Sequence, residues 1–231
     1  MTHCQDAIEY QNNVVREYLA YRVFNILTAK SFRVRVLRIT YVDTGKKNRE
    51  TVSYGFLIEP KDQLVQRVGV PTVELERVFV PDLKPAFTNL TSLFHYFLGN
   101  TDFSQIYSET GDTCCHNQVL FSNANGSYFS IPYDFDMSDF VGAEHSSPSS
   151  RFSASKPRRR LHRGWCANNA QLPASVDIFN EKRGEIDELI NTTELLSKVK
   201  RKSLLRFIDK FYKSVESAKE IEKNIVKNCK N

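Results

Sequence analysis

The chain has 231 residues, of which 41% are hydrophobic and 26% are charged, as expected for a globular domain with a substantial core. No apolar run approaches the roughly 18 to 20 residues of a membrane-spanning helix, and the first residues lack the charged start and apolar core of a signal peptide. From residue 151 onward there are 19 Lys and Arg against 10 Asp and Glu, and this basic tail suits either an anionic partner or a solvated helix face.

The first predicted element is an amphipathic helix over residues 7–28, where apolar side chains recur every three or four positions. Glu17 lies within it, either as a functional carboxylate or as an ordinary exposed charge. Residues 31–42 alternate between apolar and polar side chains and predict a strand. A turn leads to a returning strand over residues 51–58, and Pro60 ends this hairpin because proline cannot continue the ladder.

A short helix is predicted over residues 61–68 and a core helix over residues 86–98, whose large apolar side chains share one face. Gly99 is a natural helix terminator. Asp102 therefore follows a rigid helix, which is where a catalytic side chain is best held in place.

Residues 116–122 and 128–131 predict two short strands, and the Asn-Gly pair between them is a strong hairpin signal. Such a hairpin brings Asn117, at its entry, close to Asp134, at its exit. Packing of the preceding helix against the hairpin would then bring in Asp102. Carboxylates and an amide are hard oxygen ligands, so this set suits Mg²⁺ with a bound phosphate rather than zinc.

The last third of the chain begins with a loop rich in Ser, Pro and Arg over residues 142–160, which is predicted to be mobile. Its basic side chains could attract phosphate or could keep a linker soluble. One helix is predicted over residues 174–191 and one long helix over residues 194–227, with an apolar stripe for burial. Trp165, the only tryptophan, is expected to anchor the core.

Three of these motifs together carry a resemblance: Asn100-Thr101-Asp102, His116-Asn117 and Pro132-Tyr133-Asp134-Phe135-Asp136. Their order resembles the catalytic centre of the protein-kinase-like superfamily, and among its members the CotH-type atypical kinases. A narrower likeness, to a group of bacterial proteins that share the motifs THC, REYLAYR, GNTD, CCHN and PYDFD, covers nearly the whole chain but implies no reaction.

The resemblance implies an α+β, protein-kinase-like fold with two parts. Residues 1–60 would be a partial N-lobe of one helix and a β-hairpin, with the hinge near residues 59–60. Residues 61–231 would be a mostly helical C-lobe. Its parts would be a catalytic-type loop over 99–117, the Asp-Phe-Asp segment over 132–136, a mobile basic loop over 142–163 and the C-terminal helices over 174–228.

The resemblance also implies roles for the candidate residues. Asp102, Asn117 and Asp134 would form the catalytic set, with Asp102 accepting the proton of the acceptor hydroxyl. Asn117, Asp134 and Asp136 would hold Mg²⁺. The remaining candidates would serve the nucleotide: Glu17 by orienting a phosphate-binding lysine, Glu59 at the hinge that receives the adenine, and His116 beside the catalytic asparagine.

The chain departs from the kinase pattern at several points. About fifteen residues separate Asp102 from Asn117, where protein kinases have roughly four. Asp136 replaces the glycine that follows Asp-Phe, and there is no glycine-rich loop and no phosphate-binding lysine. The resemblance therefore implies that this chain starts after the first part of its N-lobe and is weakly active or inactive alone.

Five cysteines, at positions 4, 114, 115, 166 and 229, are unusual for a reduced cytosolic chain. Adjacent Cys114 and Cys115 lack the two-residue gap of a zinc knuckle, which disfavours a zinc site. The bacterial group with the shared motifs is typically exported, which would imply a disulfide from Cys114 or Cys115 to Cys166 or Cys4 and a periplasmic or extracellular location.

The sequence thus favours a phosphotransferase that uses ATP and Mg²⁺ on an unknown, possibly protein, acceptor, with no nucleic-acid partner and no membrane span. Two alternatives stay open. The first is a non-catalytic kinase-like or exported binding module in which the carboxylates hold a structural cation. The second is a carboxylate-based, metal-dependent hydrolase.

Overall fold

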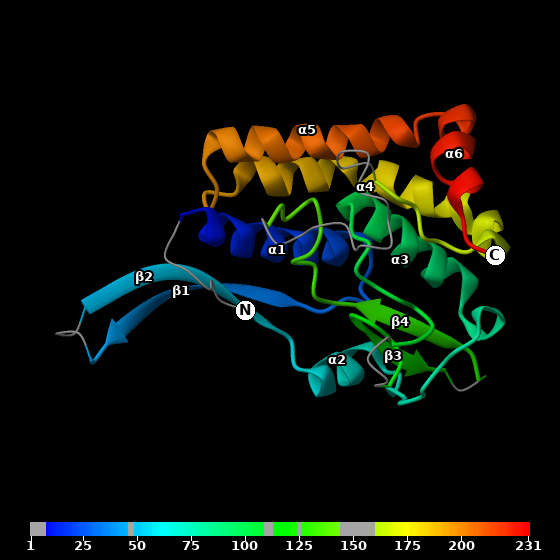
Figure 1. The fold of residues 1–231 in the computed structure, drawn as a ribbon, viewed down its shortest axis with the longest axis horizontal. Coiled ribbons are helices and arrows are strands. Elements are labelled where there is room, and N and C mark those ends of the chain that lie inside the picture. The colour runs from blue at the N-terminus through cyan, green and yellow to red at the C-terminus, as the bar shows by residue number, and fades with distance from the viewer. Residues whose placement is uncertain (1–7, 46–48, 109–112, 124–125, 144–159) are drawn as a thin grey trace.

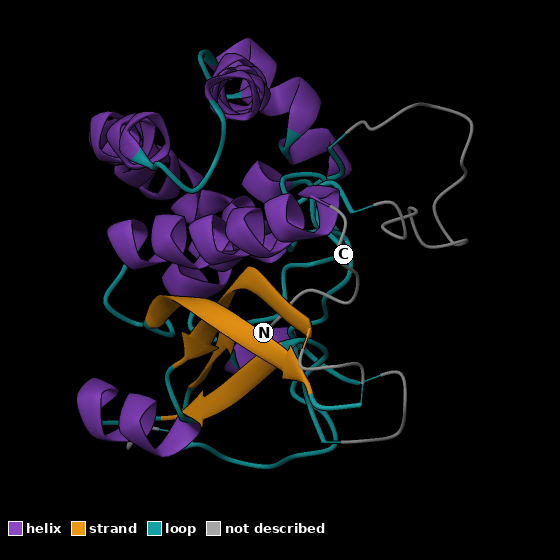
Figure 2. Ribbon diagram, turned by 90° about the vertical axis from the view of Figure 1, so that its left-hand side faces the viewer, coloured by secondary structure: helices purple, strands orange, loops and turns teal. Residues whose placement is uncertain are grey.

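A computed structural model describes residues 8–45, 49–108, 113–123, 126–143 and 160–231 of the chain, which forms an α+β fold. Figure 2 shows the strands gathered on one side of a layer of helices. The described strands form two separate antiparallel hairpins rather than one sheet. Within the described residues, no helix is both long and apolar enough to cross a membrane.

The front of the described chain is a helix packed on a hairpin. Helix α1 (Ile8–Leu27) contacts strands β1 (Val34–Asp43) and β2 (Arg49–Ile58), which pair from Val34↔Ile58 to Asp43↔Arg49. Phe56 turns inward from β2 and places its ring 5.6 Å from that of Tyr21 on α1. Figure 1 shows α1 between this hairpin and the C-terminal helices. The predicted helix and hairpin are confirmed, while the tip of the turn lies outside the described residues.

The centre of the fold is helix α3 (Pro85–Leu98), which follows helix α2 (Lys61–Val68) and a short 3₁₀ helix, η1 (Val80–Asp82). Pro85 opens α3, where its missing N–H costs nothing. Eleven consecutive residues from Thr88 to Leu98 are buried, so α3 is surrounded on all sides. It contacts strand β4 (Tyr128–Pro132) and the C-terminal helices α4 (Leu172–Thr192) and α5 (Lys198–Ser214). The predicted core helix is confirmed.

Gly99 ends α3 in a left-handed conformation, with φ of 63°. A side-chain carbon at this position would meet Cβ of Asp139 at 2.9 Å. Only glycine both adopts this φ without penalty and allows that close approach. The chain therefore turns sharply at this point, into the loop that carries Asp102.

A second hairpin follows that loop. Strands β3 (Gln118–Ser122) and β4 (Tyr128–Pro132) pair from Gln118↔Pro132 to Ser122↔Tyr128. The predicted hairpin is confirmed, although residues 124–125 of its turn lie outside the described part of the chain. Because Gln118 pairs with Pro132, the residues just outside the hairpin, Asn117 and Tyr133, are brought side by side.

The C-terminal part is helical, but the predicted single helix over 194–227 is wrong. Instead, the chain forms α4 (Leu172–Thr192), α5 (Lys198–Ser214), α6 (Ala218–Asn224) and short 3₁₀ helices at Cys166–Gln171 and Val226–Asn228. Ser217 starts α6 by accepting a hydrogen bond from the N–H of Glu220, a capping contact that competes with continued helix. The apolar stripe is nevertheless buried: Ile208, Val215 and Ile225 are at most 3% exposed.

Both observed disulfides differ from the predicted pairing. Cys114 is bonded to its neighbour Cys115, and Cys166 is bonded to Cys229. The second bond ties the start of the C-terminal region to its end, where residues 165 and 230 also form a backbone bridge. Trp165 is half-buried beside this bond rather than in the core, and its N–H donates to Gln105. Two bonded pairs fit an oxidising environment.

The predicted basic loop lies largely outside the described residues, because the structure describes nothing from 144 to 159. Arg160 and Arg163, at its C-terminal end, are described and contact the body of the protein. Cys4 also lies outside the described residues.

Candidate functional site

Three elements deliver the candidate side chains to one place. The loop after α3 supplies Asp102, the open end of the β3–β4 hairpin supplies Asn117 and Asp134, and α1 supplies Glu17. We call Glu17, Asp102, His116, Asn117, Asp134 and Asp136 the carboxylate cluster.

The tightest contacts in the cluster are made by Asp102. One of its carboxylate oxygens lies 3.0 Å from Nε2 of His116, and the other accepts a hydrogen bond of 3.0 Å from the side-chain amide of Asn117. The Asp102 side chain is 40% exposed, and that of His116 is 34% exposed. Asp102 is therefore held from two sides and still reaches solvent.

Asn117 is held in one orientation by these contacts. Its Nδ2 donates to both the backbone carbonyl of Asp102, at 2.9 Å, and the Asp102 carboxylate. Both partners are acceptors, so the amide nitrogen must face them and the amide oxygen must face away.

Asp134 leaves the hairpin in a left-handed conformation, with φ of 59°, and Asn117 enters it with φ of 55°. Aspartate and asparagine tolerate this region better than most residues. The backbone is held there because the N–H of Tyr133 donates to the carbonyl of Asn117 at 3.0 Å and the N–H of Asp134 donates to the hydroxyl of Tyr21 at 2.8 Å.

The carboxyl of Asp134 is half-buried. Burial raises its pKa to about 6, and the charges of Asp136 and Asp102 add to the rise, while His116 opposes it. The carboxylates of Asp136 and Asp102 are therefore close enough to Asp134 to affect its pKa.

Glu17 enters the cluster from the core side. Its side chain is 4% exposed, and its Oε1 has no hydrogen-bond partner among the described residues. The pKa of this carboxyl is raised to about 8, first by burial and then by Asp134 and Asp136, against a hydrogen bond from the backbone of Phe135. A buried carboxylate beside two others is costly unless a proton or a cation joins it.

Glu59 has a different environment. Its carboxylate forms a two-pronged ion pair with Arg67, at 2.9 and 2.7 Å, and also accepts the N–H of Arg33 at 3.0 Å. The N–H of Glu59 donates to the carbonyl of Arg33 at 2.8 Å. The carboxylate of Glu59 thus joins the end of β2 to α2 through Arg67, and its N–H joins the end of β2 to the start of β1 through Arg33. The structure does not bring Glu59 into the carboxylate cluster.

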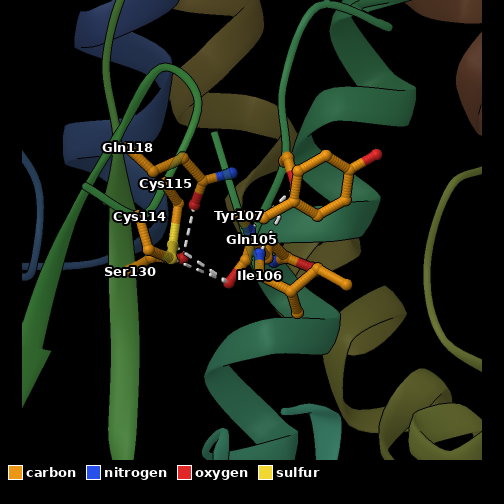
Figure 3. Close-up of a disulfide and its surroundings, with 8 residues drawn as sticks. Gln105, Ile106, Tyr107, Cys114, Cys115, Gln118 and Ser130 are labelled. Atoms are coloured by element: carbon orange, nitrogen blue, oxygen red, sulfur yellow. Dashed lines mark hydrogen bonds between the residues drawn. A yellow bond between two sulfur atoms is a disulfide. The ribbon is translucent and has the colours of Figure 1, made fainter. Parts of the chain in front are cut away.

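A buried polar network supports the cluster and was not identified from the sequence. His95 on α3 lies between the side chains of Asn100 and Gln118, at 3.3 Å from each. Asn100 in turn accepts the N–H of Asp102 at 2.9 Å. Figure 3 shows Gln118 reaching Ser130 across the hairpin, where the serine hydroxyl donates at 2.5 Å. The only sequence signal was a histidine within an otherwise apolar run.

His95 is neutral in this network. Complete burial lowers the pKa of its imidazole to about 3, and the nearby charge of Arg163 acts in the same direction. Its ring stacks on that of Phe103 at 3.7 Å. An uncharged His95 therefore links α3, the Asp102 loop and the hairpin without adding charge to the cluster.

A cavity of about 520 Å³ opens beside the cluster. His116, Asn117 and Tyr133 contribute to its wall, together with Val119 on β3 and Lys61 at the start of α2. The bonded Cys114–Cys115 pair also lines it, and Figure 3 shows this pair against the backbone of Gln105, with one sulfur 3.2 Å from that carbonyl oxygen. The cavity is large enough for a ligand of moderate size.

The donor set of the cluster fits Mg²⁺ better than a transition metal. It offers the amide oxygen of Asn117 and the carboxylates of Asp134 and Asp136, all hard oxygen ligands. Among the described residues, no three His, Cys, Asp or Glu side chains form a ready-made metal site. A Mg²⁺ ion commonly takes only one or two carboxylates and completes its shell with substrate phosphates and water. The donor set of the cluster suits such partial ligation.

The chain matches no protein-family model, and no curated protein resembles it at a significant level.

Proposed function

We propose that the chain is a kinase-like phosphotransferase domain that uses ATP and Mg²⁺ to phosphorylate a hydroxyl-bearing, possibly protein, acceptor. Its element order supports a protein-kinase-like fold: a helix with a buried glutamate, a hairpin, a core helix, an aspartate loop, and a second hairpin that ends in Asp-Phe. In this description, residues 1–60 are part of an N-lobe and residues 61–231 form a C-lobe.

One observation carries the proposal more than any other. Asn117 donates to both the carbonyl and the carboxylate of Asp102, at 2.9 and 3.0 Å, so a proton acceptor and an amide oxygen are locked together. The same hairpin delivers Asp134 beside them. A half-exposed base beside a hard-oxygen ligand set is the arrangement that phosphoryl transfer needs.

Each residue has a defined task in this mechanism. Asp102 accepts the proton of the acceptor hydroxyl while the hydroxyl oxygen forms a bond to the γ-phosphorus of ATP. The bond from that phosphorus to the β–γ bridging oxygen breaks, and ADP leaves with the electron pair. His116, 3.0 Å from Asp102, orients the carboxylate. Asn117, Asp134 and Asp136 would hold Mg²⁺, which supplies charge neutralisation for the phosphates when bound.

We assign the nucleotide to the cavity beside His116 and Asn117 rather than to the hinge at Glu59. The N–H of Glu59 already donates to Arg33, so it is not free to bind an adenine ring. The cavity, by contrast, shares Asn117 with the cluster and has Val119 and Tyr133 as apolar walls for a ring. In this assignment Glu59, whose carboxylate pairs with Arg67, lies outside the nucleotide cavity, and its predicted role at the hinge stays a prediction.

The environment of Glu17 determines how active we expect this chain to be. In a kinase-like site a glutamate at this place orients a phosphate-binding lysine, but Oε1 of Glu17 has no hydrogen-bond partner among the described residues. We expect the chain to turn over slowly, because among the described residues no lysine is bonded to Oε1 of this glutamate. Robust turnover by this chain would contradict that expectation.

The direct test is transfer of label from γ-labelled ATP, in the presence of Mg²⁺, to the chain itself or to an added acceptor. The wild-type chain should incorporate label slowly, and Asp134→Asn should abolish incorporation because the ligand set loses its central carboxylate. Asp177→Asn, an exposed change on α4, is the matched control and should behave as wild type. Equal labelling of the wild type and Asp134→Asn would count against the assignment.

A second function is favoured by the buried carboxyl of Glu17, whose Oε1 has no hydrogen-bond partner among the described residues. A binding module with a structural cation would use Asp134 and Asp136 in the same way but would need no nucleotide. Calorimetric titration separates the two. Binding of Mg²⁺ or Ca²⁺ at micromolar concentration without ATP supports the module, whereas cation binding that requires ATP supports the phosphotransferase. The two bonded cysteine pairs fit an exported protein in either case.

A further inference from the structure

The loop that carries Asp102 is clamped by a side chain from a distant part of the sequence. Nη1 of Arg163 donates to the carbonyl of Phe103 at 2.9 Å and also to the carbonyl of Thr101. These two carbonyls lie on either side of Asp102. One nitrogen of the guanidinium therefore holds the carbonyls of the residues before and after the proposed base.

The other polar groups of this short segment are held from within the cluster. The N–H of Asp102 donates to Asn100, and the carbonyl of Asp102 accepts from Asn117, both at 2.9 Å. Those ties come from the end of α3 and from the hairpin. Arg163 is the tie that comes from the C-terminal region, about 60 residues further along the chain.

The clamp is supported by packing as well as by hydrogen bonds. The guanidinium of Arg163 lies 5.1 Å from the centre of the Phe103 ring, and that ring stacks on the buried His95. Phe103 is 4% exposed, so its carbonyl has little access to water in place of the arginine. Loss of the guanidinium would leave a buried acceptor unpaired, which costs more than the net value of a hydrogen bond.

We propose that Arg163 is a positioning residue for Asp102, which couples the C-terminal region to the base of the phosphotransfer site. This inference rests on the proposed function only for its catalytic consequence. The structural part, that Arg163 holds residues 101–103, stands on its own contacts. No sequence feature indicated it, because Arg163 is one of several basic residues in an otherwise unpatterned stretch.

Arg160 supplies a matched control. It lies in the same stretch and also donates to two carbonyls, those of Phe97 and Phe207, at 3.3 and 2.7 Å. Its guanidinium lies 4.0 Å from the ring centre of Phe207. Arg160 therefore resembles Arg163 in charge, contacts and location in the chain, but its two hydrogen bonds join the last turn of α3 to the middle of α5 and do not hold residues 101–103.

The test compares Arg163→Gln, Arg163→Lys and Arg160→Gln in the full chain by amide hydrogen exchange and by release of ADP from Mg²⁺·ATP. In Arg163→Gln, exchange at residues 101–103 should rise by about tenfold or more, because charge-assisted bonds to two carbonyls are lost. Arg163→Lys should fall between Arg163→Gln and the wild type, since an ammonium keeps the charge without the planar fork. Arg160→Gln should leave exchange at 101–103 unchanged.

ADP release adds a readout that a purely structural residue would not alter. Arg163→Gln should lower kcat by about tenfold or more while the KM for ATP stays the same, because the base moves and the nucleotide cavity does not. Exchange at 101–103 that is unchanged in Arg163→Gln, or raised equally by Arg160→Gln, would overturn the proposal. If the wild type releases no ADP, the proposed function fails while the exchange comparison still decides whether Arg163 positions this loop.

Discussion

Glu17 is a buried carboxyl, which destabilises the fold when it is charged and also indicates a functional site. It lies on a helix face that buries Tyr21 and Phe24, and it approaches Asp134 and Asp136 without an observed hydrogen-bond partner for Oε1. A protein that only needed a stable core would place an apolar side chain here. A carboxyl retained at this position therefore fits a site built to receive a cation.

The raised pKa of Glu17 has a consequence for stability. The pKa of Glu17 is about 8 in the folded protein, against 4.5 for an ordinary glutamate, so the folded protein holds this proton more tightly than the unfolded chain does. The stabilising effect is complete below about pH 4.5 and is lost as the pH rises towards 8. Without divalent cations, the free energy of unfolding should therefore decline over this range.

The variant Glu17→Gln tests this directly by urea unfolding in a chelating buffer at pH 5 and pH 8. The uncharged amide should stabilise the fold at pH 8 by up to a few kcal/mol and have little effect at pH 5, because the carboxyl is already protonated there. Glu188→Gln, an exposed change on α4, should have little effect at either pH. A Glu17→Gln effect that is the same at both pH values would show that Glu17 does not titrate as the structure indicates.

At the scale of the elements, the site depends on where two short segments begin. Gly99 ends α3 and starts the loop of Asp102, while the hairpin register sets the separation of Asn117 and Asp134. Gly99 must be glycine for two reasons, its positive φ and its approach to Asp139, whereas Gly69 at the end of α2 has only the positive φ.

This difference predicts unequal costs for the same substitution. Gly69→Ala should destabilise the fold by about 1 kcal/mol, the cost of a left-handed alanine. Gly99→Ala should cost at least about 1 to 2 kcal/mol more, because the new methyl group meets Asp139 at 2.9 Å. Chemical denaturation of both variants measures the difference. Equal losses would mean that the Asp139 contact relaxes without cost.

The sequence predicted most of these elements because their signals are local. Apolar periodicity located α1 and α3, and the Asn-Gly pair located the second hairpin. The sequence did not predict the break between α5 and α6. There the hydroxyl of Ser217 accepts a hydrogen bond from the N–H of Glu220 and starts a new helix, although the apolar stripe continues across the break. Helix capping by serine competes with helix continuation, and the side-chain pattern alone does not decide between them.

The candidate site was predictable to a smaller extent. Chain order and hairpin geometry suggested that Asp102, Asn117 and Asp134 would meet, because two of them flank one hairpin. The buried link from His95 to Gln118 and the clamp by Arg163 could not be predicted, since both join segments that are far apart in the sequence. The predicted cysteine pairing was wrong for the same reason, because spacing along the chain does not show which sulfur atoms meet in space.

In the whole molecule, a disulfide joins the two ends of the C-terminal region, and Arg160 and Arg163 connect this region to α3 and to the Asp102 loop. The Cys166–Cys229 bond closes a loop with a sequence separation of 63, and the Cys114–Cys115 bond has a separation of 1. Only the longer loop restricts the unfolded chain appreciably.

The two bonds should therefore contribute differently to stability. Replacing Cys166 and Cys229 by serine should lower the free energy of unfolding by roughly 2 to 5 kcal/mol. Replacing Cys114 and Cys115 by serine should remove almost none of this loop-closure contribution. Thermal unfolding of both double variants, each carrying Cys4→Ser to prevent exchange, makes the comparison. A larger loss from the Cys114 and Cys115 change would contradict this reasoning.

Under the proposed function, the side chains of Asp102, Asn117 and Asp134 lie around one Mg²⁺ ion and its bound phosphate. Thermal unfolding with Mg²⁺, with ATP and with both tests it most directly, using Asp177→Asn as control. Saturating ATP with Mg²⁺ should raise the Tm of the wild type and of Asp177→Asn by roughly 5 °C or more, while Asp134→Asn should show no shift. A shift from the cation alone, or one that persists in Asp134→Asn, would contradict the account.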